Sequence, residues 1–324
     1  MKYCWEYTSD YLEYRNGIGL DVKNPKYFIS VFSKYLKENH PVETILTKEI
    51  TMPWCIRKES EKSYSYRKRM SDLRQFTFYL YGVGASDFVL DTSFLPKAET
   101  YIPYIFNDDE LIKLFDYFIK KSEDDPESIS KKELSIIYRL IFFLGLRPNE
   151  GREIKLEDIN LKENYILIRK NKTHKERIVA MSDDVVMMLK EYLKYRISIY
   201  PDNEYLFPCR NGKCHNRKWL SDNFREAWNS IKPSNNSARV RVYDLRHRFA
   251  TTLMMKIADE GRDLYCFIPY MSAYMGHAHF DETMYYIHLL PEKLIDSKTI
   301  DWDKMKNAIP EVSMNICSSR FDDT

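Results

Sequence analysis

The sequence predicts a mainly α-helical protein with a small β-hairpin or sheet, an α+β fold in two domains. Glycine occurs only 9 times in 324 residues, well below the average usage of about 7%, which favours long helices over many tight turns. Apolar residues recur at helical spacing in several segments. One stretch near residue 170 instead has two β-prone runs around a polar turn.

The domain boundary is predicted near residue 100, which divides the chain into residues 1–100 and 101–324. The stretch from Gly82 to Pro103 contains two glycines, two prolines and no helical period. This composition is typical of a linker.

Two helices are predicted before the linker, over residues 24–39 and 61–81. The second has an apolar stripe that forms a core face: Tyr66, Met70, Leu73, Phe76 and Leu80. Basic residues lie elsewhere on the same helix: Arg67, Lys68, Arg69 and Arg74. Such a basic face is either merely solvated or laid against the phosphates of a nucleic acid.

The predicted elements after the linker begin with a clear helix start. Asn107 and Glu110 form a pattern like a capping box, followed by an apolar helical face. A helix through residues 136–141 ends at Gly145, and Pro148 opens a short helix. A hairpin over residues 165–169 and 176–180 and a helix over 183–197 follow.

The charge and cysteine content narrow the class of protein. The total of 50 Lys and Arg against 48 Asp and Glu is almost balanced, but residues 151–250 are net basic and the remainder is net acidic. That asymmetry suits a face that meets a polyanion, without distinguishing DNA from RNA or an acidic protein. The 6 cysteines are scattered, there is no signal peptide pattern, and no apolar run is long enough to span a membrane. We expect a reduced, cytoplasmic protein.

Two short pieces carry residues suited to binding a phosphodiester. Arg147 follows Gly145 and enters a new helix, where backbone N–H groups also favour an anion, and Glu150 is placed to orient its guanidinium. Lys172 lies at the hairpin tip, from where a protonated amine can reach a leaving oxygen. Taken alone, each piece is more typical of an ordinary surface position.

Two further pieces lie nearer the C-terminus. Tyr243 and Arg246 are three residues apart and share a helix face, whereas His247 and Arg248 are expected to point elsewhere. The fourth piece runs from Met275 to His288 and contains a Tyr-Tyr pair, which in isolation suits core packing.

In this order, the four pieces resemble the tyrosine recombinase family of phage integrases and related site-specific recombinases. The family pattern is an arginine in Gly-Leu-Arg-x-x-Glu, a hairpin lysine, His-x-x-Arg, a box like Leu-Gly-His, and a tyrosine nine residues after that histidine. The matching residues are Arg147, Lys172, Tyr243 with Arg246, His277 and Tyr286. The similarity covers about residues 105–292.

The resemblance implies a catalytic domain preceded by a SAM-like helical domain that closes over DNA. Arg147 and Arg246 would clamp the scissile phosphate, and His277 would donate a hydrogen bond to it. Tyr286 would attack to give a 3′-phosphotyrosyl intermediate, and Lys172 would protonate the leaving 5′ oxygen. The basic residues that would position the duplex are Arg67, Lys68, Arg69, Arg74, Lys170 and Lys175.

The resemblance also implies partners and a setting. The expected partner is double-stranded DNA, with a homotetramer assembled on paired sites, an accessory DNA-bending or directionality factor, and a location at the nucleoid. Residues 289–305 resemble a C-terminal helix that docks on a neighbouring protomer, although such a tail packs equally well on its own domain. A mobile genetic element is the expected setting.

No cofactor or metal is expected. There is no Gly-x-x-x-x-Gly-Lys-Ser/Thr loop and no carboxylate group spaced for magnesium. The one metal-like cluster, Cys209 and Cys214 with His215, fits no zinc spacing well.

Two departures from the family pattern leave alternatives open. Tyr243 stands where histidine is usual, and a phenol with a pKa near 10 is a poor base at neutral pH. The stretch from Thr252 to Met275 is also longer than usual and suits a lid or a partner surface. The alternatives to a recombinase are a catalytically degenerate DNA-binding regulator and an enzyme like a type IB topoisomerase.

Overall fold

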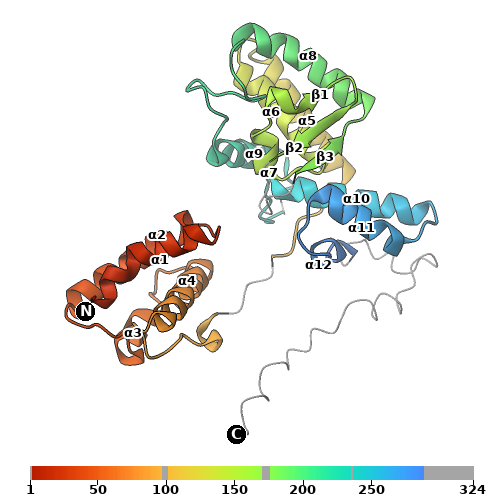
Figure 1. Ribbon diagram of the computed structural model, residues 1–324. Helices are drawn as coiled ribbons and strands as arrows, with labels where there is room; N and C mark the ends of the chain where they lie inside the picture. Colours follow the sequence, from red (N-terminus) through yellow and green to blue (C-terminus); the bar gives the residue numbers. More distant parts are fainter. Residues whose placement is uncertain (1, 97–100, 170–175, 235, 288–324) are drawn as a thin grey trace. The chain divides into compact units, whose positions relative to one another are not determined.

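The computed structural model describes residues 2–96, 101–169, 176–234 and 236–287, and the chain forms two compact units, Met1–Ile102 and Pro103–Thr324 (Figure 1). The predicted mainly helical α+β fold is confirmed. No helix in the described part of the chain combines the length and apolar character needed to cross a bilayer.

The first unit is a small helical domain. Its elements are η1 (Cys4–Glu6), α1 (Tyr7–Gly17), α2 (Lys23–Asn39), α3 (Lys48–Cys55), α4 (Ser63–Gly82) and η2 (Thr92–Phe94). The predicted apolar stripe of α4 lies in the core, where Leu73 and Phe76 pack with Phe32 of α2 and are fully buried. Burial of these large apolar side chains holds the unit together.

The segment predicted as a linker is mostly part of the first unit. Ala85 and Leu90 are buried in its core. The backbone N–H of Leu46 donates to the carbonyl of Ala85 at 2.8 Å, and Ser86 Oγ donates to the carbonyl of Leu46 at 2.8 Å. The segment lacks a helical period because it is irregular backbone tied down by these bonds, not because it is free.

The second unit has eight helices and three strands in its described part, with one helical turn, η3 (Leu156–Asp158). The helices are α5 (Asp108–Glu123), α6 (Ile129–Phe143), α7 (Pro148–Arg152), α8 (Asp183–Ile199), α9 (Arg217–Ile231), α10 (Tyr243–Asp259), α11 (Leu264–Met275) and α12 (Asp281–Met284). Helix α6 packs against α5, α8 and α10. Its residues Ile137, Leu140 and Ile141 are fully buried, because they form the apolar face of an amphipathic helix, whereas Lys131, Lys132 and Arg139 lie on the more exposed side.

The strands form one antiparallel sheet in the order β1 (Ile159–Asn160), β2 (Tyr165–Ile168) and β3 (Arg177–Ala180). Ile166 pairs with Val179, and both are fully buried. The predicted hairpin is therefore present. Its turn, residues 170–175, lies outside the described residues.

Two glycines change the direction of the chain beside the second unit's core. Gly145 follows α6 with φ +60° and Gly276 ends α11 with φ +66°, the left-handed region that glycine adopts without strain. A Cβ on Gly145 would lie 2.4 Å from the ring of Phe249, and one on Gly276 would lie 2.9 Å from Arg177 Nη1. Each turn therefore needs a residue without a side chain, and each brings a backbone carbonyl to the same region.

Truncation of a core residue of α5 tests the predicted amphipathic helix. We expect Leu114→Ala to lower the free energy of unfolding by about 2–5 kcal/mol, because Leu114 is fully buried and its removal leaves a cavity. The matched control is Ile112→Ala on the same helix, where the side chain is 58% exposed and the cost should stay within about 0.5 kcal/mol. Urea unfolding followed by circular dichroism measures both, and equal costs would contradict the assigned faces.

Candidate active site

A single buried carboxylate, Glu150 on α7, organises the arginines of the second unit. Its Oε1 accepts hydrogen bonds from Arg147 Nη1 and Arg177 Nη1, both at 2.9 Å. Its Oε2 accepts from Arg177 Nη2 at 2.7 Å and from the backbone N–H of Arg147 at 2.8 Å. Burial by itself would raise the pKa of Glu150, but the paired Arg177 outweighs burial and the pKa falls to about 2. Glu150 is therefore ionised at neutral pH.

Arg147 lies at the N-terminal boundary of α7, directly before Pro148. Its Nη2 donates to the carbonyl of Gly276 at 2.6 Å, which links α7 to the turn after α11. Burial opposes its charge, yet Glu150 and then Tyr243 favour the charged form and raise the pKa of Arg147. Its side chain is 15% exposed, so Arg147 is less completely buried than its counter-ion Glu150.

Arg246 on α10 is completely buried. Its Nη1 donates to the carbonyl of Gly145 at 2.8 Å and its Nη2 to the carbonyl of Met275 at 2.6 Å. Its Nη1 also lies 3.9 Å from Glu150 Oε2. Arg147 and Arg246, 99 positions apart in the sequence, thus share Glu150 as a counter-ion and the two glycine turns as hydrogen-bond acceptors.

His277 lies directly after Gly276 and contacts Arg246. Its Nε2 is 3.1 Å from Arg246 Nη2, which can only donate, so Nε2 is the acceptor. The proton of the neutral ring is therefore assigned to Nδ1, which donates to Thr283 Oγ1 at 2.7 Å. Burial, followed by the charges of Arg246 and Arg147, lowers the pKa of His277 to about 3. Donation from Nε2 to a phosphate thus requires a change of tautomer or protonation.

Tyr286 follows α12 and is 2% exposed. Its ring stacks on His277 with centroids 6.0 Å apart and an interplanar angle of 14°. Burial raises the pKa of Tyr286 to about 12, although Arg246 acts in the opposite direction. The neighbouring Tyr285 is partly exposed, and its ring meets that of Tyr286 at 6.4 Å. Tyr286 is therefore the tyrosine of this pair that lies with the arginines.

Tyr243 is the first residue of α10 and is only partly buried. The Arg246 guanidinium carbon lies 5.9 Å from the centre of its ring. Its ring centroid is 5.0 Å from that of His247. The phenol that replaces the expected histidine is thus in the cluster, beside both arginines.

The prediction that His247 points away from the site is wrong. His247 is buried, and its ring centroid lies 5.4 Å from that of Tyr286. Helical spacing within α10 does not reveal this contact. Tyr286 lies 39 positions after His247, and only the folding of the chain brings the two rings together. Arg248 does point elsewhere, since its Nη2 pairs with Asp108 at 2.6 Å.

Arg177 is a member of the cluster that the sequence reasoning missed. It forms the paired bond to Glu150, its Nε donates to the carbonyl of Tyr274 at 2.8 Å, and its side chain is 7% exposed. A signal was present in the alternation of β3. Arg177 shares a face with buried Val179, whereas Ile178 between them is 58% exposed, so the arginine takes an inward position.

The hairpin lysines Lys170, Lys172 and Lys175 lie outside the described residues, so their predicted roles stay predictions. The C-terminal helix expected over residues 289–305 also lies outside them. The longer stretch from Thr252 to Met275 forms the end of α10 and all of α11, and Tyr265 and Phe267 pack against the core cluster of these two helices.

The basic residues of α4 in the first unit divide into two groups. Arg69 is buried, and its Nη2 donates hydrogen bonds within the unit, to Glu61 Oε2 at 2.7 Å and to the carbonyl of Ile56 at 3.1 Å. Its predicted contact with DNA is corrected to a structural role, because no edge of the group is left for a phosphate. Lys68 pairs with Asp72 at 3.1 Å, and Arg67 donates to the carbonyl of Pro96. Both are partly exposed, as is Arg74.

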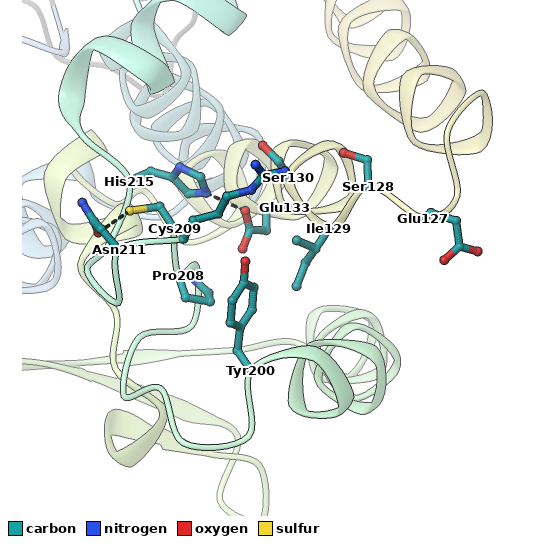
Figure 2. A pocket seen from close by; sticks show the side chains of 11 residues that line it. Glu127, Ser128, Ile129, Ser130, Glu133, Tyr200, Pro208, Cys209, Asn211 and His215 are labelled. Atoms are coloured by element: carbon teal, nitrogen blue, oxygen red, sulfur yellow. Dashed lines mark hydrogen bonds and ion pairs between the residues drawn. The ribbon is translucent and has the colours of Figure 1, made fainter.

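A separate cavity of about 570 Å³ lies between the N-terminal end of α6 and the loop before α9 (Figure 2). His215 Nε2 lies 2.6 Å from Glu133 Oε2, and Cys209 Sγ points to Asn211 Oδ1 at 2.8 Å (Figure 2). Burial raises the pKa of Glu133, which His215 partly opposes. Within the described ranges, no three His, Cys, Asp or Glu side chains converge to hold a metal ion. His215, the histidine of the zinc-like cluster, thus has its Nε2 hydrogen-bonded to Glu133.

Comparison with known proteins places residues 106–293 under the model of the phage integrase family. A tyrosine recombinase of Thermosipho africanus is 25% identical over 300 residues, covering 90% of this chain and 97% of that protein. The range matched by the family model contains every residue of the arginine cluster.

Solved structures of the same fold include DNA complexes. The XerH site-specific recombinase bound to its palindromic difH substrate has a TM-score of 0.64 and 19% identity, over 87% of this chain and 80% of that one. The Tn1549 transposon integrase in complex with a circular intermediate DNA has a TM-score of 0.63 and 14% identity, over 88% and 95%. At these identities the likeness is one of fold.

Removal of the central carboxylate charge is the sharpest test of this arrangement. We expect Glu150→Gln to lower the free energy of unfolding by about 3–5 kcal/mol at pH 7, because it leaves buried guanidiniums without a counter-ion. The folded pKa of Glu150, about 2, lies below the unfolded value of about 4.3. The difference between wild type and variant should therefore be full above pH 4.3 and shrink as the pH falls toward 2.

Urea unfolding between pH 3 and pH 7 measures this difference. The matched control is Glu153→Gln, one turn further along, whose side chain is 44% exposed and whose loss should cost little at any pH. A cost for Glu150→Gln that does not change with pH would contradict the proposed charge balance.

Proposed function

This chain belongs to the phage integrase family and is a tyrosine recombinase, a DNA strand-transferring enzyme, and we propose that Tyr286 is its nucleophile. The observation that carries the proposal is that Arg147 and Arg246 meet at one carboxylate while His277 contacts Arg246 and Tyr286 stacks on His277, although these residues come from segments far apart in the sequence. These are the residue types that hold a phosphodiester and attack it.

The two arginines would bind the scissile phosphate. Attack places negative charge on the non-bridging oxygens, which the planar guanidiniums of Arg147 and Arg246 can meet with paired hydrogen bonds. In the present structure both donate to backbone carbonyls beside the glycine turns. A phosphate would add to or replace those acceptors.

The chemical step follows from the positions of the reacting groups. Tyr286 Oη forms a bond to phosphorus as the bond from phosphorus to the 5′ oxygen breaks, which gives a 3′-phosphotyrosyl link. Lys172, as the family resemblance implies, supplies the proton for the 5′ oxygen. The link conserves the phosphodiester, so a 5′ hydroxyl of another strand can reverse the step without ATP, a metal or another cofactor.

DNA would be held by both units. We propose that the first unit is a DNA-binding domain, with Arg67, Lys68 and Arg74 on phosphates and Lys170 and Lys175 contributing from the hairpin of the second unit. The XerH and Tn1549 structures of the same fold contain DNA, which supports DNA as the partner. We also propose that the protein assembles as a homotetramer on paired DNA sites at the nucleoid. It would act with an accessory DNA-bending or directionality factor, in a mobile genetic element.

A second function is favoured by one observation. Tyr243 replaces the usual histidine, so a non-catalytic DNA-binding regulator would keep the same fold. The two functions differ in whether a covalent link to DNA forms, since a regulator binds DNA with salt-sensitive affinity and leaves it intact.

Tyr286→Phe is the direct test of the proposed chemistry. We expect wild-type protein to form a covalent adduct with nicked duplexes drawn from the flanks of its own gene, and Tyr286→Phe to form none while its DNA affinity stays nearly unchanged. The physical reason is that the variant lacks only the attacking oxygen. A denaturing gel detects the adduct, and a gel shift measures the affinity.

The matched control is Tyr285→Phe, which should retain the adduct. An adduct that survives in Tyr286→Phe but disappears in Tyr285→Phe would assign the attack to the other tyrosine. Tight binding with no wild-type adduct would favour the regulator. Relaxation of any supercoiled plasmid without paired sites would instead favour an enzyme like a type IB topoisomerase.

A further inference from the structure

The chemistry proposed above needs an acceptor for the proton of Tyr286. The hydroxyl is buried and its pKa is about 12, so the phenolate is scarce at neutral pH and attack requires proton removal. In the usual family pattern a histidine stands where this chain has Tyr243, whose neutral phenol is not a useful base.

The neighbours of Tyr286 in the described residues can be compared as proton acceptors. Arg147 and Arg246 are permanently protonated. His277 has its Nε2 lone pair directed at Arg246 and its Nδ1 bonded to Thr283. The arginines therefore cannot accept a proton, and both ring nitrogens of His277 are already engaged.

His247 differs from the other neighbours of Tyr286 because one of its ring nitrogens has no hydrogen-bond partner in the described part of the chain. Its ring contacts those of both Tyr243 and Tyr286, at centroid distances of 5.0 Å and 5.4 Å. Its Nδ1 is buried and has no hydrogen-bond partner in the described part of the chain. A buried polar atom without a partner costs about 1–3 kcal/mol and calls for an explanation, which a role in proton transfer supplies.

The charged groups around His247 keep its ring neutral. Burial lowers the pKa of His247 to about 3, and the cations Arg241, just before α10, and Arg246, on α10, act in the same direction. His277 and Tyr286 face it from beyond α11 and are neutral as well. The imidazole therefore keeps a lone pair throughout the neutral pH range, while the same burial and cations oppose the protonated form that proton transfer creates.

We propose that His247 accepts the proton of Tyr286 during DNA cleavage, the task that Tyr243 cannot perform. The inference rests on the proposed function, with Tyr286 as nucleophile. As Tyr286 Oη bonds to phosphorus, its proton passes to an imidazole nitrogen of His247, and the bond from phosphorus to the 5′ oxygen breaks. The 5′ oxygen takes its proton from the protonated lysine already assigned to it. In the reverse step His247 returns its proton to Tyr286.

The test is His247→Gln, which keeps a polar side chain of similar size without a comparably basic nitrogen. We expect the single-turnover rate of adduct formation on a nicked duplex to fall about 10²-fold, with DNA affinity and melting temperature close to wild type. Without an internal base, the rate should depend on the fraction of phenolate. It should then rise about tenfold per pH unit between pH 6 and pH 9, whereas the wild-type rate stays nearly flat.

Restoration in a double variant separates proton transfer from mere support of the ring. Tyr243→His places an imidazole at the family's usual position, so Tyr243→His with His247→Gln should recover most of the rate and the flat pH profile. His247→Asn replaces His247→Gln in both measurements if the glutamine variant does not fold.

Each result decides between the readings. A variant rate and pH profile like those of the wild type would overturn the proposal. A slow variant with a flat profile and no restoration would also overturn it, since His247 would then only hold Tyr286 in place. Absence of an adduct in the wild type itself would instead overturn the proposed function, and this inference with it.

Discussion

The buried carboxylate of Glu150 is the interaction on which the rest of the site depends. Three guanidiniums, those of Arg147, Arg177 and Arg246, lie within 4 Å of it. Cations brought this close together in a largely buried site repel one another and lose their hydration. One ionised carboxylate with four short hydrogen bonds makes their assembly favourable. The low pKa of Glu150 shows that these interactions outweigh the cost of burying its charge. The cluster keeps a net positive charge, which suits a phosphate.

The two glycine turns convert this charge cluster into a shaped site. The carbonyls of Gly145 and Gly276 accept from Arg246 and Arg147, respectively, so backbone geometry fixes where each guanidinium points. Arg177 packs so closely on Gly276 that a Cβ would lie 2.9 Å away. Hydrogen bonds from side chains to backbone carbonyls therefore join β3 to α11, through Arg177, and join the ends of α6 and α11, through Arg246.

A layer of phenol and imidazole rings covers the arginines. Burial lowers the pKa of His247 and His277 and raises that of Tyr286, so all three are neutral at physiological pH. The nearby cations reinforce the neutral form of the imidazoles while they stabilise a phenolate. The energetic obstacle to attack is therefore the Tyr286 proton, and Tyr243 is unsuited to remove it. In our proposal, the neutral imidazole of His247 beside Tyr286 accepts this proton in place of the histidine that the family pattern has at position 243.

The sequence by itself determined the helical class, the helix ends at Asn107, Gly145 and Pro148, and the hairpin, because capping, turn chemistry and apolar periodicity act over a few residues. Motif spacing identified Arg147, Arg246, His277 and Tyr286 as candidates. Tertiary structure alone decided that Arg69 is buried in the first unit, that Arg177 joins Glu150, and that His247 faces Tyr286. Those outcomes depend on contacts between residues up to 97 positions apart, such as Arg177 with Tyr274, and local patterns carry no information on which distant groups burial brings together.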